Sequence, residues 1–267
     1  MPIYSAIVGG IVGTIYFIIT GFPILPVQDA LIILTTGMLS IWGLAIYFKA
    51  LMLEETSRII IFFKAIPVFV LILSTLFLKE SISVPQLTGF ILILISVSGV
   101  SMKQNQRVSP KNFFASGLGL ILLVDVLWAI SAILVKFTIS QQSFASIISY
   151  ESWGVSLGGL LLYICVPTIR DAFHYTQHSV TKRAIVFIFG NEFLFVLSRA
   201  VTFYAYSLGP ASLVSVVGTS QVFYGILLGF LLSKLHPSVY EEDTTSKSIY
   251  AKFFWGIVLL VGIYLIT

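Results

Sequence analysis

The sequence predicts an all-α integral membrane protein with about nine transmembrane helices. Of the 267 residues, 58% are hydrophobic and only 10% are charged, and the mean hydropathy is +1.03. These values lie outside the range of soluble globular domains. A helix that crosses the roughly 30 Å hydrocarbon core of a bilayer needs about 20 mostly apolar residues. Nine such windows fit the chain, so lipid is its expected solvent.

The windows follow one another with short polar stretches between them. The first has no Lys or Arg before it, and its Gly9, Gly10 and Gly13 form a helix-packing surface. It therefore differs from the leucine-rich core of a signal peptide, and we expect it to stay in the membrane. The nine windows are residues 4–22, 27–53, 59–78, 87–102, 113–135, 144–167, 184–208, 211–232 and 249–266.

Three pairs of glycines are spaced four residues apart inside these windows. They are Gly9 with Gly13, Gly154 with Gly158, and Gly225 with Gly229. This spacing lets two helix backbones approach closely. The pairs indicate helix packing, either within the chain or across a homodimer.

The two halves of the chain have a weak, ordered similarity at an offset of 155 residues. The matched identities are Phe48, Ala50, Ser57, Leu73, Leu76, Lys79 and Val84 with Phe203, Ala205, Ser212, Leu228, Leu231, Lys234 and Val239. An odd number of spans separates each matched helix from its counterpart, which gives inverted topology. Such repeats are typical of transporters, although apolar sequences also align by chance. We expect a four-helix repeat over 1–102, a linker over 103–112 and a five-helix repeat over 113–267.

Short motifs in both halves resemble one transporter family. The first half has residues 50–57 (ALMLEETS), 65–67 (AIP), 78–80 (LKE) and 86–89 (QLTG), and the second has residues 205–212 (AYSLGPAS) and Trp255-Gly256. Together they resemble the EamA type of the drug/metabolite transporter (DMT) superfamily. The resemblance implies two five-helix repeats, ten helices in all, around a central cavity.

The chain departs from that family pattern in three places. We expect the first repeat to lack the opening helix, because the window 4–22 is followed directly by the one that corresponds to the third helix of a repeat. In the second repeat, Leu235 and His236 stand where the first has Glu80 and Ser81, and a polar insertion follows. Val222 stands where the first repeat has Pro67.

A lysine in the third window is the first candidate for the substrate cavity. Charged groups inside hydrocarbon cost about 3 kcal/mol each and normally face a cavity or a partner. Lys64 lies one turn into the window and three residues before Pro67, which we expect to bend the helix and to free a carbonyl group. The alternative is that Lys64 extends its charge to the membrane surface.

A second candidate group lies in the window 184–208. Glu192 and Arg199 are seven residues apart, so they share a helix face. They are separated by roughly 10 Å along the helix, too far for a direct pair. We expect them to line the substrate path together with Asn191, Tyr204 and Gln221. The alternative is a structural ion-pair network with Asp125 or Lys64.

Asp125 is the candidate for proton coupling. It lies among leucine and valine residues, where a charged carboxyl group is costly, and such a group can carry the proton of a transport cycle. Glu151 and Tyr150 could act similarly, but their position nearer a helix end favours the membrane interface.

Other functional classes are disfavoured. His174 and His178 have the spacing of metal ligands, but we expect them in a polar loop without a third ligand, so we expect no metal. Cys165 is the only cysteine and can form no intrachain disulfide. The basic residues form no stripe that would suit nucleic acid. The chain has no nucleotide-hydrolysis motif and no paired catalytic groups, so we expect neither a cofactor nor an enzyme.

The sequence therefore predicts a secondary transporter for a small polar or amphipathic solute, such as an amino acid or a nucleotide sugar. We expect it in the lipid bilayer of a plasma or inner membrane. Most Lys and Arg residues fall in loops on the side of the N-terminus, which places that side in the cytoplasm and the C-terminus outside. The family resemblance instead implies a cytoplasmic C-terminus. The alternative function is a membrane scaffold that does not transport.

Overall fold

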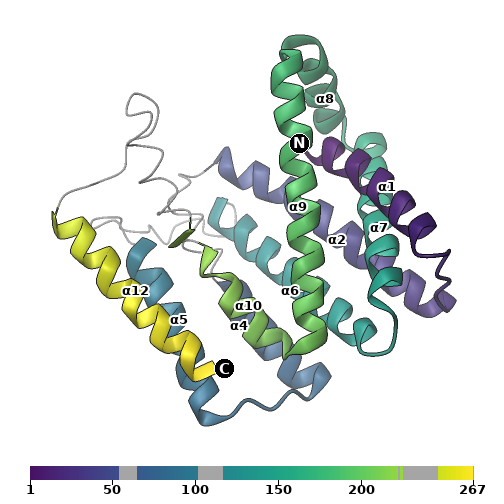
Figure 1. Ribbon diagram of the computed structural model, residues 1–267. Coiled ribbons are helices and arrows are strands. Elements are labelled where there is room, and N and C mark those ends of the chain that lie inside the picture. The colour runs from purple at the N-terminus through teal and green to yellow at the C-terminus, as the bar shows by residue number, and fades with distance from the viewer. Residues whose placement is uncertain (54–64, 102–116, 222, 225–245, 267) are drawn as a thin grey trace.

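The computed structural model describes residues 1–53, 65–101, 117–221, 223–224 and 246–266, and every regular element in these ranges is a helix (Figure 1). The helices are α1 (Pro2–Ile19), α2 (Val27–Leu51), α4 (Ile66–Leu73), which continues into the π-helix η2 (Ser74–Leu78), α5 (Val84–Ser101), α6 (Gly117–Ile139), α7 (Phe144–Cys165), α8 (Pro167–Ser179), α9 (Lys182–Leu208), α10 (Ala211–Gly218) and α12 (Ser246–Ile266).

Five of these helices are long and apolar enough to cross a membrane, namely α1, α2, α6, α7 and α9. Three of the other predicted windows correspond to shorter apolar helices, over Ile66–Leu78, Val84–Ser96 and Phe253–Ile266. The remaining window, 211–232, begins as α10 and continues into residues outside the described ranges, as does the predicted linker 103–112. The described ranges are thus all-helical, with apolar helices that are typical of a membrane protein.

Helix α8 was not predicted. The polar stretch after α7 was expected to be a loop, but Pro167 stands at the start of a 13-residue helix. Proline is tolerated there because the first amides of a helix have no intrahelical partner. Helix α9 follows after a short turn, and the Thr181 side chain accepts a hydrogen bond from the Ala184 amide at its start.

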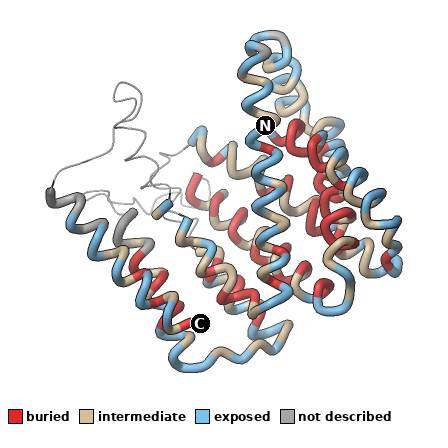
Figure 2. The backbone as a smooth tube through the Cα atoms, viewed as in Figure 1, coloured by how far each residue is buried: buried red, intermediate tan, exposed pale blue. Residues whose placement is uncertain are grey.

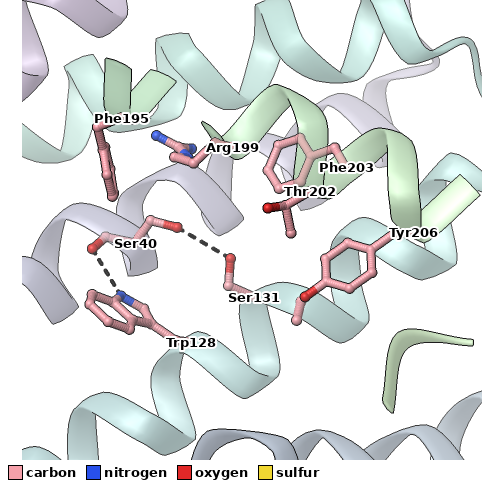
Figure 3. A pocket seen from close by; sticks show the side chains of 9 residues that line it. Ser40, Trp128, Ser131, Phe195, Arg199, Thr202, Phe203 and Tyr206 are labelled. Carbon is pink, nitrogen blue, oxygen red and sulfur yellow. Dashed lines mark hydrogen bonds between the residues drawn. The ribbon is translucent and has the colours of Figure 1, made fainter. Parts of the chain in front are cut away.

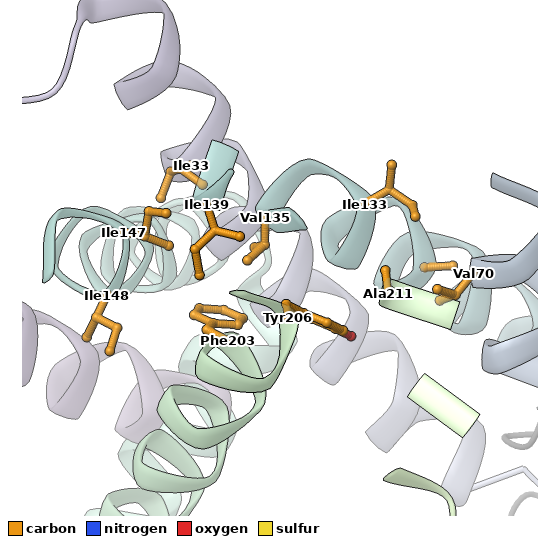
Figure 4. Packing of buried hydrophobic residues seen from close by; sticks show 11 residues of the cluster. Ile33, Val70, Ile133, Val135, Ile139, Ile147, Ile148, Phe203, Tyr206 and Ala211 are labelled. Carbon is orange, nitrogen blue, oxygen red and sulfur yellow. The ribbon is translucent and has the colours of Figure 1, made fainter. Parts of the chain in front are cut away.

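The helices pack in a series across the molecule. Helix α1 packs on α7, α7 on α2, α2 on α6 and α6 on α4, while α10 lies against α4 and α12 against α5. In Figure 1 the α5–α12 pair and the α1–α7 pair stand at opposite sides of the bundle. The largest cluster of buried side chains lies between them and joins α2, α4, α6, α7, α9 and α10 (Figure 4).

Small residues set the closest helix contacts. A Cβ atom added at Gly37 of α2 would collide with the backbone of α7 at Glu151, and one added at Gly154 of α7 would collide with the backbone of α2 at Leu34. Gly9 and Gly13 lie in the same way against α7. The described glycine pairs therefore serve packing within the chain, as small residues commonly do between membrane helices.

Helix α9 is the least covered of the five long helices. Only 6% of its apolar window is buried, against 28–50% for the other four, and Figure 2 shows it mostly in the colour of exposed residues. Phe187 and Leu194 are 68% and 64% exposed. In a membrane, such side chains contact lipid, so α9 has one lipid face and one face toward the bundle.

Candidate functional site

A cavity of about 230 Å³ lies between α2, α6 and α9 (Figure 3). Its described lining residues are Ser40 from α2, Trp128, Ser131 and Ala132 from α6, and Phe195, Arg199, Thr202, Phe203 and Tyr206 from α9. The wall is mainly aromatic, with a few hydroxyl groups and one guanidinium. This composition is typical of sites for organic solutes.

The wall formed by α2 and α6 is fixed by hydrogen bonds. The hydroxyl groups of Ser40 and Ser131 are 3.3 Å apart, and Ser131 donates to the carbonyl oxygen of Thr36 at 3.2 Å. The indole N–H of Trp128 donates to the carbonyl oxygen of Ser40 at 3.2 Å. The indole lies against Gly43, where a Cβ atom would collide with it. These contacts hold the Trp128 ring in place beside the cavity.

Arg199 supplies the charge of the opposite wall. Its guanidinium forms an ion pair with Glu151 of α7 and lies 5.8 Å from the ring centroids of both Phe195 and Phe203. The side chains of Arg199 and Glu151 are 16% and 2% exposed. A solute in the cavity therefore meets the cation, because the carboxylate lies behind it. Two flanking rings add a cation–π contribution to holding the guanidinium.

Packing between α2 and α7 positions Glu151. Because Gly37 has no side chain, α2 lies directly against the backbone of α7 at this residue. The sequence predicted Glu151 to lie nearer the membrane interface, and in the structure its carboxylate is buried inside the bundle. A buried charge is costly unless it is paired, and Arg199 is its partner.

The other candidate residues of α9 and α10 do not line the cavity in the described part of the chain. Glu192 is 4% exposed and lies near Ser5 and the Met1 amine of α1. Asn191 and Gln221 are exposed. Tyr204 is 55% exposed and contacts the Phe144 ring, with a centroid separation of 5.9 Å. Of the predicted cavity residues that the structure describes, only Arg199 lines the cavity.

The first predicted cation lies outside the described residues, because these begin again at Ala65 after a gap that includes Lys64. Pro67 stands in the first turn of α4. An amide there has no acceptor within the helix, so the missing N–H of proline costs no intrahelical hydrogen bond. The carbonyl group that Pro67 is predicted to free lies four residues before it, in the gap, so this prediction falls outside the described residues.

Asp125 is fully buried, and neither carboxyl oxygen has a hydrogen-bond partner among the residues that the structure describes. It lies one turn before Trp128 and two turns before Ala132, so it shares the face of α6 that lines the cavity. The carboxyl group therefore lies near the middle of α6 and on the side of the helix that faces the cavity.

The histidines do not assemble a metal site in the described ranges, where no group of three metal-ligating side chains is found. His174 lies on α8 and is 2.9 Å from the Tyr163 hydroxyl group, so its position in a loop was wrongly predicted. Cys165 is exposed at the end of α7.

Most lining residues were missed because they carry no charge. On α9 they could have been found, since Phe195, Thr202, Phe203 and Tyr206 repeat with the helical period on the face of Arg199. Of the α2 and α6 lining residues, Ser40, Ser131 and Ala132 gave no comparable signal. Glu151 was considered, but nothing in the sequence indicated its contact with Arg199.

Comparison with known proteins gives a family match in the first half of the chain. Residues 2–102 match the EamA-like transporter family. No curated protein matches the chain significantly. One solved structure, described only as the crystal structure of a protein, aligns with 100% of this chain and 85% of its own chain, with a TM-score of 0.65 and 14% sequence identity. At that identity, the likeness shows a shared fold. The family match over residues 2–102 confirms the resemblance to the EamA-type transporters of the DMT superfamily.

Proposed function

We propose that the chain is a secondary transporter that moves a small amphipathic solute with a carboxylate group through the cavity between α2, α6 and α9. The observation that carries the proposal is the position of Arg199, a cation that borders a cavity inside a bundle of apolar helices. Ionisable groups at such positions mark the pathways of substrates and ions.

The arrangement of helices supports alternating access between two inverted repeats of four and five helices. In chain order, α1, α4 and α5 of the first half correspond to α7, α10 and α12 of the second. Each of the three packs on its counterpart, as expected for helices near a two-fold axis between two halves. The substrate sites of such transporters lie where the repeats meet, and the cavity is lined by both halves.

The size and lining of the cavity indicate the kind of solute. Its volume of about 230 Å³ lies below the range of about 300–1,000 Å³ that is usual for drug-sized ligands, which favours a solute of amino-acid size over a nucleotide sugar. Arg199 can bind a carboxylate through two parallel hydrogen bonds. The rings of Trp128, Phe203 and Tyr206 suit an apolar side chain.

Uptake into proteoliposomes tests this function. We expect the purified full chain to take up leucine or its deaminated carboxylate, 4-methylpentanoate, and not the corresponding amine, isopentylamine. A nucleotide sugar serves as the size control. If none of these solutes is taken up or raises the thermal stability of the protein, the proposal fails and a scaffold that does not transport becomes the better explanation.

We further propose that Asp125 carries the coupling proton. Among the described residues, this buried carboxyl group has no hydrogen-bond partner, so loss of its proton leaves a charge without hydrogen bonds from those residues in the bilayer. On α2, the ionisable Tyr47 packs against the cluster that contains Ile121 and lies 6.3 Å from the Trp128 ring. Among the described residues, α4 contributes no ionisable side chain, and α9 contributes Arg199 at the cavity.

Asp125→Asn is expected to abolish uptake driven by a pH gradient and to retain solute exchange at equal pH. Asparagine has the shape of the protonated carboxyl group but cannot release a proton. The measurement compares gradient-driven uptake with counterflow in the same vesicles. The matched control is Asp29→Asn at the start of α2, where the carboxylate accepts a 2.7 Å hydrogen bond from Gln142. This role is ruled out if the rate of uptake by the wild-type protein does not change when a pH gradient is imposed.

A further inference from the structure

A lysine of α6 holds the last carbonyl groups of α9. The Lys136 ammonium, in the last turn of α6, donates to the carbonyl oxygens of Tyr206 at 2.6 Å and Gly209 at 2.8 Å. These carbonyl groups lie where α9 ends, at the negative end of its dipole, and a cation is favourable there. The ammonium therefore fixes the end of α9 to the end of α6.

A glutamate of the first half holds the start of α10. Glu80 follows η2 and Lys79, whose left-handed backbone turns the chain. One carboxylate oxygen of Glu80 accepts from the Ala211 amide at 2.9 Å, and the other lies 3.4 Å from the Ser212 hydroxyl group. The first amides of α10 lack intrahelical partners, and an anion is favourable at this end of a helix.

The Lys136 hydrogen bonds hold the end of α9, and the Glu80 hydrogen bonds hold the start of α10. Together they hold both ends of the α9–α10 turn. They lie directly beyond the cavity, because Arg199, Thr202 and Tyr206 line it in order toward the end of α9. The side chain of Tyr206 lines the cavity while its carbonyl group accepts from Lys136. Figure 4 shows Tyr206 at the end of α9 beside the core residues of α6.

We propose that Glu80 and Lys136 form a gate that closes the cavity at the end where α6 and α9 end and α10 begins. Glu80 belongs to the first half of the chain, and the turn that it holds belongs to the second. Movement of one half against the other, on which the proposed transport depends, separates these groups and opens the cavity to that side. The charge pattern of the loops assigns this side to the exterior.

Cysteine labelling tests the gate without any solute. The reporter is Thr202→Cys, in the cavity wall, in a chain whose exposed Cys165 is replaced by serine. A membrane-impermeant maleimide is added to proteoliposomes from one side at a time. Glu80→Gln and Lys136→Met each remove a charged partner from the closed state only, so we expect labelling from the α9–α10 side to become about tenfold faster. Lys136→Arg keeps the donor and should stay near the starting rate.

Asp29→Asn is the matched control, because it removes the charge of another hydrogen-bonded carboxylate at the same end of the bundle, away from the α9–α10 turn. Its labelling rate should not change. The gate is refuted if Glu80→Gln and Lys136→Met label no faster than Asp29→Asn, or if labelling accelerates equally from both sides, since general loosening then explains the result. Labelling does not require solute flux, so the gate can be tested even if the protein transports none of the solutes tried.

Discussion

Replacing Arg199 by glutamine is expected to weaken the binding of 4-methylpentanoate or leucine by about 10- to 100-fold. The substitution removes a charge-assisted hydrogen bond to the solute, which contributes about 1.5–3 kcal/mol. Binding to the purified protein is measured by calorimetry, and flux is measured in proteoliposomes. Arg183→Gln is the control on the same helix, because Arg183 is exposed and lies over the Phe187 ring, away from the cavity.

The single variant also leaves Glu151 buried without a partner, so its effect on stability must be separated from its effect on binding. Breaking a buried ion pair on one side costs about 3–5 kcal/mol. The double variant Arg199→Gln with Glu151→Gln removes both charges and should recover most of the stability without recovering binding. Recovery of binding in the double variant would contradict the role of Arg199 in holding the solute.

Replacing Gly37 by alanine is expected to destabilise the bundle by about 1–3 kcal/mol. The added methyl group would collide with the backbone of α7 at Glu151, so α7 must move. Since Glu151 pairs with Arg199, we expect weaker solute binding as well as a lower midpoint of thermal unfolding in detergent.

Gly190→Ala is the matched control for this substitution. Gly190 lies inside α9, and a Cβ atom there meets nothing within 4 Å. Alanine is the better helix former by up to about 1 kcal/mol, so this variant should equal or exceed the stability of the parent protein. A loss as large as that of Gly37→Ala would show that the close contact with α7 is not the cause.

Local sequence was sufficient to predict the five helices that are long and apolar enough to cross a membrane. Helix α2 begins at Val27 and α9 ends at Leu208, as the windows 27–53 and 184–208 predicted. The reason is that lipid offers no hydrogen bonds to the backbone, so an apolar window must satisfy its own amides and carbonyls as a helix. Composition gave no such signal for α8, whose polar sequence resembles a loop.

The composition of the candidate site depended on contacts that local sequence does not encode. Glu192 and Arg199 share a helix face, yet Glu192 lies against α1 and Arg199 borders the cavity, because different neighbours cover that face at different depths. Glu80 was known only as part of a family motif, and its hydrogen bond to Ala211 joins residues 131 positions apart.

The sequence by itself determined that this is a membrane protein, that its apolar windows form helices, and that the few charges inside them need partners. All three conclusions follow from the free-energy cost of exposing polar groups to hydrocarbon. Only the tertiary structure decided which partners these are. Gly37 allows α2 to meet α7 at Glu151, and the packing of α7 beside α9 brings that carboxylate to Arg199. The depth at which two helices meet is a property of their shared surface, and neither helix specifies it alone.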